Sequence, residues 1–368
     1  MDVYFIIYNL MEKKLTFLGI ETSCDETASS VVQENDDGTA KVLSNVISSQ
    51  IKEHEKFGGV VPEIAARSHL ENIELVIQEA LDKSKKKISD IDGIAATAGP
   101  GLVVCLNIGY NIGKSIAAFE NKTFLPINHL EGHALSPSIE NKISYPYLLL
   151  LVSGGHSQFL IIKDLDNYKR IGTTIDDAVG EAFDKTAKIL NLGYPGGPCV
   201  EKFSKLGDNN KYTLPLPIIN RSGCNLSLAG LKTDVLRKSK NLMTEQDRYD
   251  LAASFQEAIN KILSKKSEIA MKEFLSESSN NSINYFVVAG GVASNETIRK
   301  SLKNICLKMN FKPIFPSKEF CGDNAAMIAW AGIQRFKKKL FNTKNEAVKP
   351  RWPLDLKAPF LKGSGLKL

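Results

Sequence analysis

The stretch YLLLLVSGGHSQFLII, residues 147–162, gives the clearest indication of how this chain folds. Residues 148–152 form an unbroken apolar run, which is typical of a strand buried on both faces of a sheet. The run ends at SGGH, residues 153–156, and a second apolar run, residues 159–162, follows directly. Two such runs joined by a short glycine turn predict a β-hairpin. Glycines in the turn let the backbone approach a ligand closely, and their N–H groups can point at an anion such as phosphate.

The pattern of a strand followed by glycines occurs twice more. Residues 285–289 run into GGVASN, residues 290–295, and residues 93–98 run into GPG, residues 99–101. One glycine pair alone is more simply an ordinary turn. Three strand ends of this kind favour a nucleotide held between the ends of sheets.

The predicted elements form two mixed α/β lobes with a similar order, which suggests an ancient duplication. In the first lobe we expect strands at 15–20, 28–33, 42–48, 91–98 and 123–127, and helices at 63–83 and 102–119. In the second lobe we expect strands at 148–152, 159–162, 168–173, 284–289 and 312–315, and helices at 175–192, 199–206, 244–275, 294–309 and 323–340. Residues 207–232 are rich in turn formers.

These elements predict a division of the chain into domains. Residues 15–145 form the first lobe, and residues 146–345 form the second, with a helical insertion at about 175–275. Residues 1–14 are interpreted as an N-terminal extension that is disordered or follows from an upstream start codon, and residues 346–368 as a tail.

The composition is that of an ordinary globular protein with length enough for two domains. The 368 residues are 43% hydrophobic and 24% charged, with a net charge of +6 that permits an RNA or nucleotide partner. Six scattered cysteines without a CxxC pair favour a reducing compartment and no disulfide framework. No apolar run reaches membrane-spanning length, and residues 1–10 lack the features of a signal or transit peptide. We therefore expect a cytoplasmic protein without a membrane partner, with the mitochondrial matrix as the alternative.

The segment HLEGH, residues 129–133, has the spacing of a metal site. On a helix, His129 and His133 share one face, so both imidazoles can bind one metal ion. The alternative is a pair of helix histidines that have this spacing by chance. Glu131 follows the first histidine by two positions, so it is badly placed as the base of a metallopeptidase. A third ligand must come from elsewhere, and Asp323 at the start of a predicted helix could be that ligand or an N-cap.

A series of longer motifs accompanies these features. In chain order they are GIETSCDET (19–27), GGVVPEIAARSH (58–69), TAGPGL (97–102), HLEGH (129–133), LLVSGGHSQ (150–158), IDDAVGEAFDKTAKILNLGYPGGP (175–198), SLAGLKT (227–233), AGGVASN (289–295), FCGDNAAMIA (320–329) and PRWPLD (350–355). With these motifs, which cover nearly the whole chain from about Leu15, the chain resembles the universal family that makes N6-threonylcarbamoyladenosine in tRNA. The first and sixth motifs favour its bacterial and mitochondrial branch.

The resemblance implies an α/β architecture with the actin-like ATPase (ASKHA) fold, in which two similar lobes surround a nucleotide cleft. It also implies that His129, His133 and Asp323 bind one divalent metal ion, with Fe²⁺ favoured and Zn²⁺ as the alternative. Two nitrogens and one carboxylate leave coordination positions open for substrate, as in catalytic sites.

The resemblance further implies an adenine nucleotide substrate, threonylcarbamoyl-AMP. Its contacts map onto Leu151, Val152, Ser153, Gly154, Gly155, Asp184, Gly197 and Asn295. The glycine turn would offer backbone N–H groups, and Gly197 would allow close approach of the sugar. Asp184 could accept both ribose hydroxyls, although a solvated helix carboxylate is the commoner role, and Asn295 could bind an adenine edge. Glu26 and His156 are weaker candidates, and we assign no general base.

The implied reaction is acyl transfer to the N6 amine of adenosine 37 in tRNAs that read ANN codons, with AMP as leaving group. The carbamoyl carbonyl would be polarised at the metal site and at the 153–155 loop. The tRNA would lie on basic surface, for which Arg335, Lys337, Lys338, Lys339 and Arg351 are candidates, although a charge run is usually a solvated face.

Bacterial members of the family need two partner proteins, an inactive paralogue of the same fold and a small P-loop ATPase. Mitochondrial members act alone as homodimers. Two other functions remain open at this point, a metallopeptidase, which the spacing of Glu131 opposes, and a nucleotide-binding scaffold without catalysis, which the intact metal-binding residues oppose.

Overall fold

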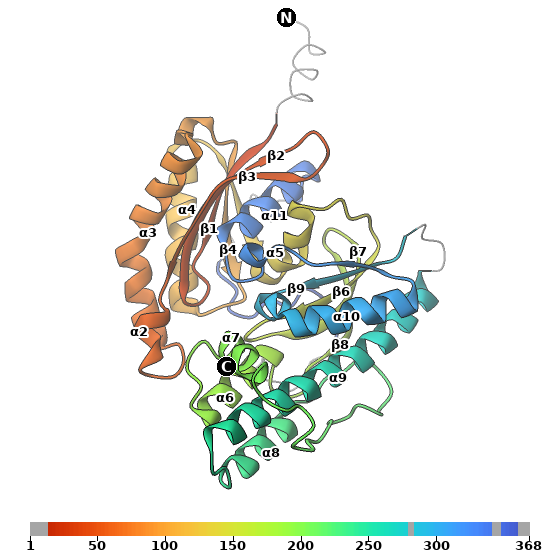
Figure 1. The fold of residues 1–368 in the computed structure, drawn as a ribbon. Coiled ribbons are helices and arrows are strands. Elements are labelled where there is room, and N and C mark those ends of the chain that lie inside the picture. Colours follow the sequence, from red (N-terminus) through yellow and green to blue (C-terminus); the bar gives the residue numbers. More distant parts are fainter. Residues whose placement is uncertain (1–13, 279–282, 341–346, 360–368) are drawn as a thin grey trace, which may run out of the picture. The chain divides into compact units, whose positions relative to one another are not determined.

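The computed structural model describes residues 14–278, 283–340 and 347–359, so the interpretation of residues 1–10 falls outside it. The chain divides into two compact units (Figure 1). Unit 1 contains residues up to 50, residues 62–142 and residues 324–352, and unit 2 contains residues 51–61, residues 143–323 and residues from 353 onward. Each of the two is built around its own five-stranded sheet.

The sheet of unit 1 has the strand order β3-β2-β1-β4-β5. Its strands are β1 (Thr16–Glu21), β2 (Glu26–Glu34), β3 (Ala40–Ser49), β4 (Gly93–Gly99) and β5 (Thr123–Asn128). β1 pairs antiparallel with β2 and parallel with β4, and β5 continues the parallel half. The helices are α3 (Pro62–Ser84), α4 (Val103–Phe119), α5 (His129–Leu135) and α11 (Ala325–Lys337), with the short turns η1 (Ile88–Asp90) and η2 (Ser136–Ile139).

Side-chain alternation along β1 explains how helices cover both faces of this sheet. Leu18 and Ile20 join the core formed with α3 and α4. Gly19 faces the other way, where an added Cβ would lie 2.2 Å from the backbone oxygen of Ala325. The glycine therefore lets α11 pack directly on the strand, and Figure 1 shows α11 on the face opposite α3 and α4.

The sheet of unit 2 repeats this topology. Its order, β8-β7-β6-β9-β10, places an antiparallel pair of strands on one side of β6 and two parallel neighbours on the other. The strands are β6 (Tyr147–Val152), β7 (Ser157–Asp164), β8 (Asn167–Thr173), β9 (Tyr285–Ala289) and β10 (Lys312–Ile314). The predicted hairpin at 147–162 is confirmed, and the matching topology supports the predicted duplication.

The helices of unit 2 pack around one large apolar core. They are α2 (Ile51–Glu55), α6 (Val179–Leu190), α7 (Gly196–Ser204), α8 (Ala229–Ser239), α9 (Glu245–Glu277) and α10 (Glu296–Met309), with the short turns η3 (Gly291–Ser294) and η4 (Lys318–Phe320). Within the described residues, no helix has both the length and the apolar character needed to cross a membrane.

The structure divides the chain differently from the sequence prediction. The helix expected at 323–340 was assigned to the second lobe, but α11 belongs to unit 1 because it packs on β1. The segment 51–61 belongs to unit 2. The prediction also missed α8, which lies partly in the turn-rich segment 207–232, and it began α6 four residues too early. Asp176 accounts for the start of α8, because its carboxylate accepts hydrogen bonds from the N–H groups of Leu228 and Ala229 there.

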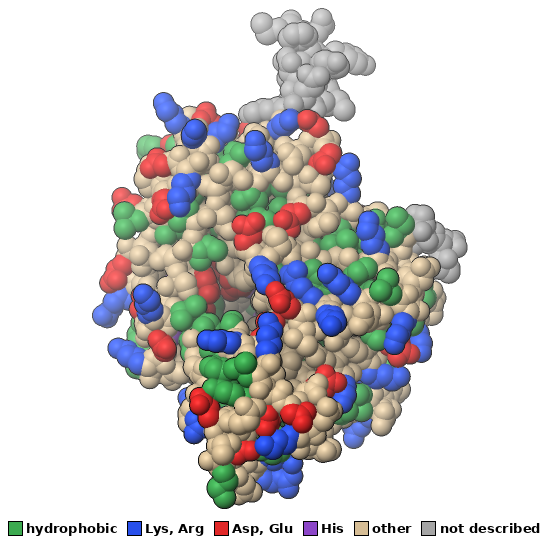
Figure 2. All heavy atoms as spheres, in the orientation of Figure 1, with side chains coloured by type: hydrophobic (Ala, Val, Ile, Leu, Met, Phe, Trp, Pro, Cys, Tyr) green, Lys and Arg blue, Asp and Glu red, His purple; other side chains and the backbone are tan. Residues whose placement is uncertain are grey.

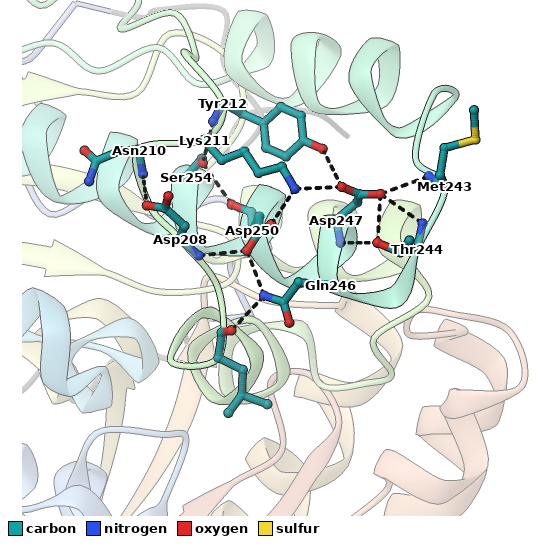
Figure 3. A network of polar contacts seen from close by, with 11 residues as sticks. Asp208, Asn210, Lys211, Tyr212, Met243, Thr244, Gln246, Asp247, Asp250 and Ser254 are labelled. Carbon is teal, nitrogen blue, oxygen red and sulfur yellow. Dashed lines mark hydrogen bonds and ion pairs between the residues drawn. The ribbon is translucent and has the colours of Figure 1, made fainter.

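A network of hydrogen bonds connects residues 208–212, which precede α8, to the first turns of α9 (Figure 3). Lys211 donates to Asp247 and to Asp250, each over 2.8 Å. Asp250 also accepts from the backbone N–H of Asp208, and the hydroxyl of Thr244 accepts from the N–H of Asp247 as the helix N-cap. One lysine between two carboxylates therefore connects two segments about forty residues apart in the sequence.

Replacing Asp247 by Asn should destabilise this connection in a pH-dependent way. The hydrogen bond from Lys211, followed by those from Thr244 and Met243, holds the pKa of Asp247 below its ordinary value of 3.8. Because the folded pKa is the lower one, the stabilisation is present above pH 3.8 and is lost as the pH falls through the folded pKa. Hydrogen exchange at residues 208–212 should therefore be faster in Asp247→Asn than in wild type at pH 7, with a difference that shrinks below about pH 4.

The control variant is Glu79→Gln, which removes an exposed ion pair with Lys83 on α3. It should change neither exchange at 208–212 nor the thermal unfolding midpoint appreciably. Equal protection of residues 208–212 in Asp247→Asn and wild type at pH 7 would contradict the stabilising role of the network.

Candidate functional site

The two histidines of the HxxxH segment lie on a short, completely buried helix. α5 begins directly after β5, and the Asn128 side chain caps it by accepting from the N–H groups of Leu130 and Glu131. His129 and His133 are one turn apart, and their ring centroids are 4.7 Å from each other. The prediction that both imidazoles share one helix face is confirmed.

Asp323 directly precedes α11, which packs on α5. Gly132 marks this contact, because an added Cβ would lie 2.9 Å from the side chain of Ile328. The N-cap of α11 is Asn324, whose side-chain oxygen accepts from the N–H of Met327. Asp323 is therefore not the N-cap, since its neighbour performs the capping, and its role as a metal ligand stays a prediction.

His129, His133 and Asp323 each offer one ligand atom, and these three atoms lie within 4.8 Å of one another. Two imidazole nitrogens and one carboxylate oxygen suit Fe²⁺ or Zn²⁺ and leave coordination positions for substrate. The residues present therefore fit the divalent metal ion that the sequence predicted.

Glu131 lies on the same helix but faces away from the ligands. It is wholly buried and forms a bidentate ion pair with Arg335. The Nε of Arg335 lies 2.5 Å from one carboxylate oxygen, and Nη2 lies 2.9 Å from the other. This contact confirms that Glu131 is badly placed as a metallopeptidase base. It also corrects the assignment of Arg335 to the tRNA surface, because its side chain is only 14% exposed and serves the ion pair with Glu131.

The predicted substrate residues belong to unit 2, and five of them, residues 151–155, lie where strand β6 of its sheet ends. Leu151 and Val152 close the buried strand β6, and the 153–155 loop follows. The backbone carbonyl oxygen of Ser153 accepts a hydrogen bond from the N–H of Gly180 at the start of α6. The Ser153 hydroxyl accepts one from the N–H of His156. Gly154 and Gly155 are exposed, and a Cβ on either would meet no atom within 4 Å.

The neighbouring parallel strand β9 ends at the same edge. Gly290 follows it with φ +95°, and an added Cβ would lie 2.3 Å from the backbone oxygen of Val152. Only a glycine fits this close approach of the two strand ends. Asn295, a few residues on, caps α10 by accepting from Ile298 and donates one amide hydrogen to Gln256. Its predicted contact with an adenine would use the second amide hydrogen, so it stays a prediction.

Asp184 and Gly197 lie where α6 meets α7. The Asp184 carboxylate accepts from the N–H of Gly196 over 2.9 Å, so it is more than a solvated helix carboxylate. An added Cβ on Gly196 would lie 2.4 Å from the Cα of Asp184, whereas Gly197 has open space at the same position. This is compatible with close approach of a sugar to Gly197, which stays a prediction.

The sequence analysis gave no role to Glu21, although GIETSCDET was among its motifs. In the structure the Glu21 carboxylate lies 3.0 Å from Nδ1 of His129. A buried glutamate at the end of a strand was the available signal, but only the fold shows which histidine it reaches. The weaker candidate Glu26 is the half-buried first residue of β2.

This chain is similar in sequence to known proteins over nearly its whole length. The family model for tRNA N6-adenosine threonylcarbamoyltransferase matches residues 41–330. A protein of that name from Pelagibacter ubique is 58% identical over 358 residues, which cover 97% of this chain and 100% of the relative. Another from Brucella canis is 47% identical over 95% of this chain and 98% of its own length.

The chain belongs to the tRNA N6-adenosine threonylcarbamoyltransferase family. Solved structures with low sequence identity support the fold of this threonylcarbamoyltransferase family member. HypF from T. kodakarensis has a TM-score of 0.58 at 14% identity, over 89% of this chain and 48% of HypF, and a full-length HypF in a phosphate- and nucleotide-bound form has a TM-score of 0.55. This chain thus spans about half the length of either HypF chain and has the predicted actin-like ATPase fold.

Replacing His133 by Ala should remove most of the metal from this family member. One of three ligands is lost, so the metal content after anaerobic loading with Fe²⁺, or with Zn²⁺, should fall from about one ion per chain to a small fraction. Mass spectrometric metal analysis of the desalted protein measures this. His54→Gln, which changes a histidine outside the cluster, is the control, and equal metal content in His133→Ala and wild type would refute the ligand assignment.

Proposed function

We propose that this chain transfers the threonylcarbamoyl group from threonylcarbamoyl-AMP to N6 of adenosine 37 in tRNAs that read ANN codons. The observation that carries the proposal is the match to tRNA N6-adenosine threonylcarbamoyltransferases over almost the whole of both chains. The clustering of His129, His133 and Asp323 adds that the residues needed for a metal centre are together.

The reaction is an acyl transfer in which one bond forms and one breaks. The N6 nitrogen of adenosine forms a bond to the carbamoyl carbon, and the bond from that carbon to the phosphate oxygen of AMP breaks. AMP leaves with the electron pair, and the amine proton passes to solvent. Because AMP is a good leaving group, the mechanism needs no strong general base.

The residues of unit 2 would bind the nucleotide part of the donor. N–H groups of Gly154 and Gly155 in the exposed loop could donate to its phosphate, and open space beside Gly197 would admit the sugar. Asp184 is half-buried, and a carboxylate in its position could accept the two ribose hydroxyls. Asn295 would bind the edge of the adenine.

The candidate metal centre would hold Fe²⁺, with Zn²⁺ as the alternative. When bound by His129, His133 and Asp323, such an ion supplies Lewis-acid stabilisation for the oxygen of the acyl donor. The metallopeptidase alternative is disfavoured because Glu131 is committed to Arg335. The scaffold alternative is disfavoured because the three ligands are together.

The tRNA would lie on exposed basic surface. Of the predicted residues, Lys338, Lys339 and Arg351 are exposed, and Lys337 forms an exposed ion pair with Glu34. Figure 2 shows further Lys and Arg side chains over α10 of unit 2, where Lys300, Lys303 and Lys308 are exposed. The α10 lysines are a second candidate contact with phosphate groups that the sequence analysis missed.

Replacing one of these basic residues should weaken tRNA binding only by removing its ionic contact with a phosphate group. Lys339→Ala and Arg351→Ala should each reduce the slope of log affinity against log salt by about 1 if the residue contacts a phosphate. Filter binding or anisotropy with one unmodified tRNA at several salt concentrations gives this slope. Lys261→Ala on α9, where Lys261 pairs with Glu257, is the control, and an unchanged slope removes a residue from the proposed surface.

The named relatives are bacterial, so we propose that this chain acts in the cytoplasm with an inactive paralogue of the same fold and a small P-loop ATPase. Activity as an independent homodimer is the alternative. A reconstitution separates the two: purified chain, synthetic threonylcarbamoyl-AMP and unmodified tRNA are incubated with and without both partners, and nucleosides are analysed by mass spectrometry. Modified nucleoside only with partners supports the multi-protein system. Modification by the chain alone supports the homodimer, and no modification under either condition refutes the proposed function.

A further inference from the structure

A buried carboxylate lies within hydrogen-bond distance of His129, one of the candidate metal ligands. Glu21, the last residue of β1, is completely inaccessible to solvent. Its Oε1 accepts from the backbone N–H of Ser23 over 2.5 Å. Its Oε2 accepts from the hydroxyl of Thr97 over 2.5 Å and lies 3.0 Å from Nδ1 of His129.

The sheet of unit 1 brings these groups together at the carboxyl ends of its parallel strands. β1 pairs with β4 so that Ile20 lies beside Ala96, which places Glu21 next to Thr97. β5 is the next parallel strand, and His129 follows it directly as the first residue of α5. The contact is therefore fixed by strand register and does not depend on a flexible loop.

The carboxylate decides which nitrogen of His129 carries the hydrogen. An ionised carboxylate only accepts hydrogen bonds, so the Nδ1 that faces it must be the donor. In a neutral imidazole the other nitrogen, Nε2, then has a free electron pair. The Ser23 hydroxyl, 3.2 Å from the same Nδ1, lies on the same side of the ring as Glu21.

We propose that Glu21 is a positioning residue of the metal centre, which fixes the ring orientation and the tautomer of His129 so that Nε2 binds the ion. Glu21 touches neither the ion nor the substrate in this account and acts through the histidine. Carboxylates that accept from the second nitrogen of a ligating histidine raise metal affinity, and their loss typically weakens it about 10- to 100-fold. The inference rests on the metal centre of the proposed function.

The alternative is that Glu21 only stabilises the fold around β1 and β4. Glu21→Gln distinguishes the two roles because glutamine keeps the shape but replaces one acceptor by a donor. If the amide oxygen faces Ser23, the amide nitrogen faces Nδ1 of His129 and favours the tautomer that cannot bind metal through Nε2. If the amide oxygen faces His129, two donors meet at Ser23, which costs stability but keeps the tautomer.

The test measures the affinity of the full-length chain for Zn²⁺ by competition with a chromophoric chelator. Glu21→Gln and Glu21→Ala should bind Zn²⁺ about 10- to 100-fold more weakly than wild type. The matched control is Asp250→Asn, which also alters a buried carboxylate in a strong polar contact, with Lys211 and far along the chain from the candidate metal ligands. It should lower thermal stability while the affinity for Zn²⁺ stays within about twofold of wild type.

A second readout follows the histidine itself. Long-range ¹⁵N–¹H NMR at neutral pH should show His129 of wild type with hydrogen on Nδ1, and Glu21→Gln with a large population carrying hydrogen on Nε2. Wild type with hydrogen on Nε2 of His129 would overturn the proposal even if no variant folded. Unchanged affinity in both Glu21→Gln and Glu21→Ala, or an equal loss in Asp250→Asn, would also overturn it. Because only metal affinity and tautomer are measured, failure here leaves the test of the transfer reaction unaffected.

Discussion

The buried ion pair between Glu131 and Arg335 is the contact on which the candidate metal centre depends. It joins α5, which carries both histidines, to α11, which begins directly after the third ligand. Glu131 is fully buried and Arg335 is mostly buried, so breaking this ion pair by removing one partner would cost about 3–5 kcal/mol. The close contact of Gly132 with Ile328 holds the same two helices at short range. The distance from the histidines to Asp323 is thus set by packing between helices almost two hundred residues apart in sequence.

The two units use one topology for different chemistry. In unit 1, the carboxyl ends of the parallel strands present the Glu21 carboxylate, and the two histidines of the candidate metal centre follow on α5. In unit 2, the equivalent edge presents the exposed 153–155 loop and the tight approach of Gly290 to β6. In open α/β sheets, ligands generally bind at the carboxyl ends of the parallel strands. A duplicated fold therefore offers two edges, of which one suits a cation and the other suits an anionic nucleotide.

Much of this arrangement could be predicted from local patterns in the sequence. The apolar runs at 148–152 and 159–162 predicted a hairpin, because strands buried on both faces contain no polar residues. The HxxxH spacing predicted that both histidines lie on one face of α5. Contacts distant in sequence could not be predicted in the same way. The charge of Arg335 indicated a basic surface, whereas its partner Glu131 lies 204 residues earlier. α11 packs in unit 1 because Gly19 has no Cβ and lets the helix lie directly on β1. α8 begins where the Asp176 carboxylate accepts a hydrogen bond from the backbone N–H of Leu228.

The sharpest test of the metal centre is X-ray absorption spectroscopy of the iron- or zinc-loaded chain, because it reports the atoms bound to the metal ion. We expect two imidazole nitrogens and one carboxylate oxygen, with the remaining positions filled by oxygen from solvent. The imidazole scattering should be reduced in His133→Ala. A sulfur ligand, for example from the half-buried Cys24, or a spectrum without imidazole would contradict the assignment of His129, His133 and Asp323 as the metal centre.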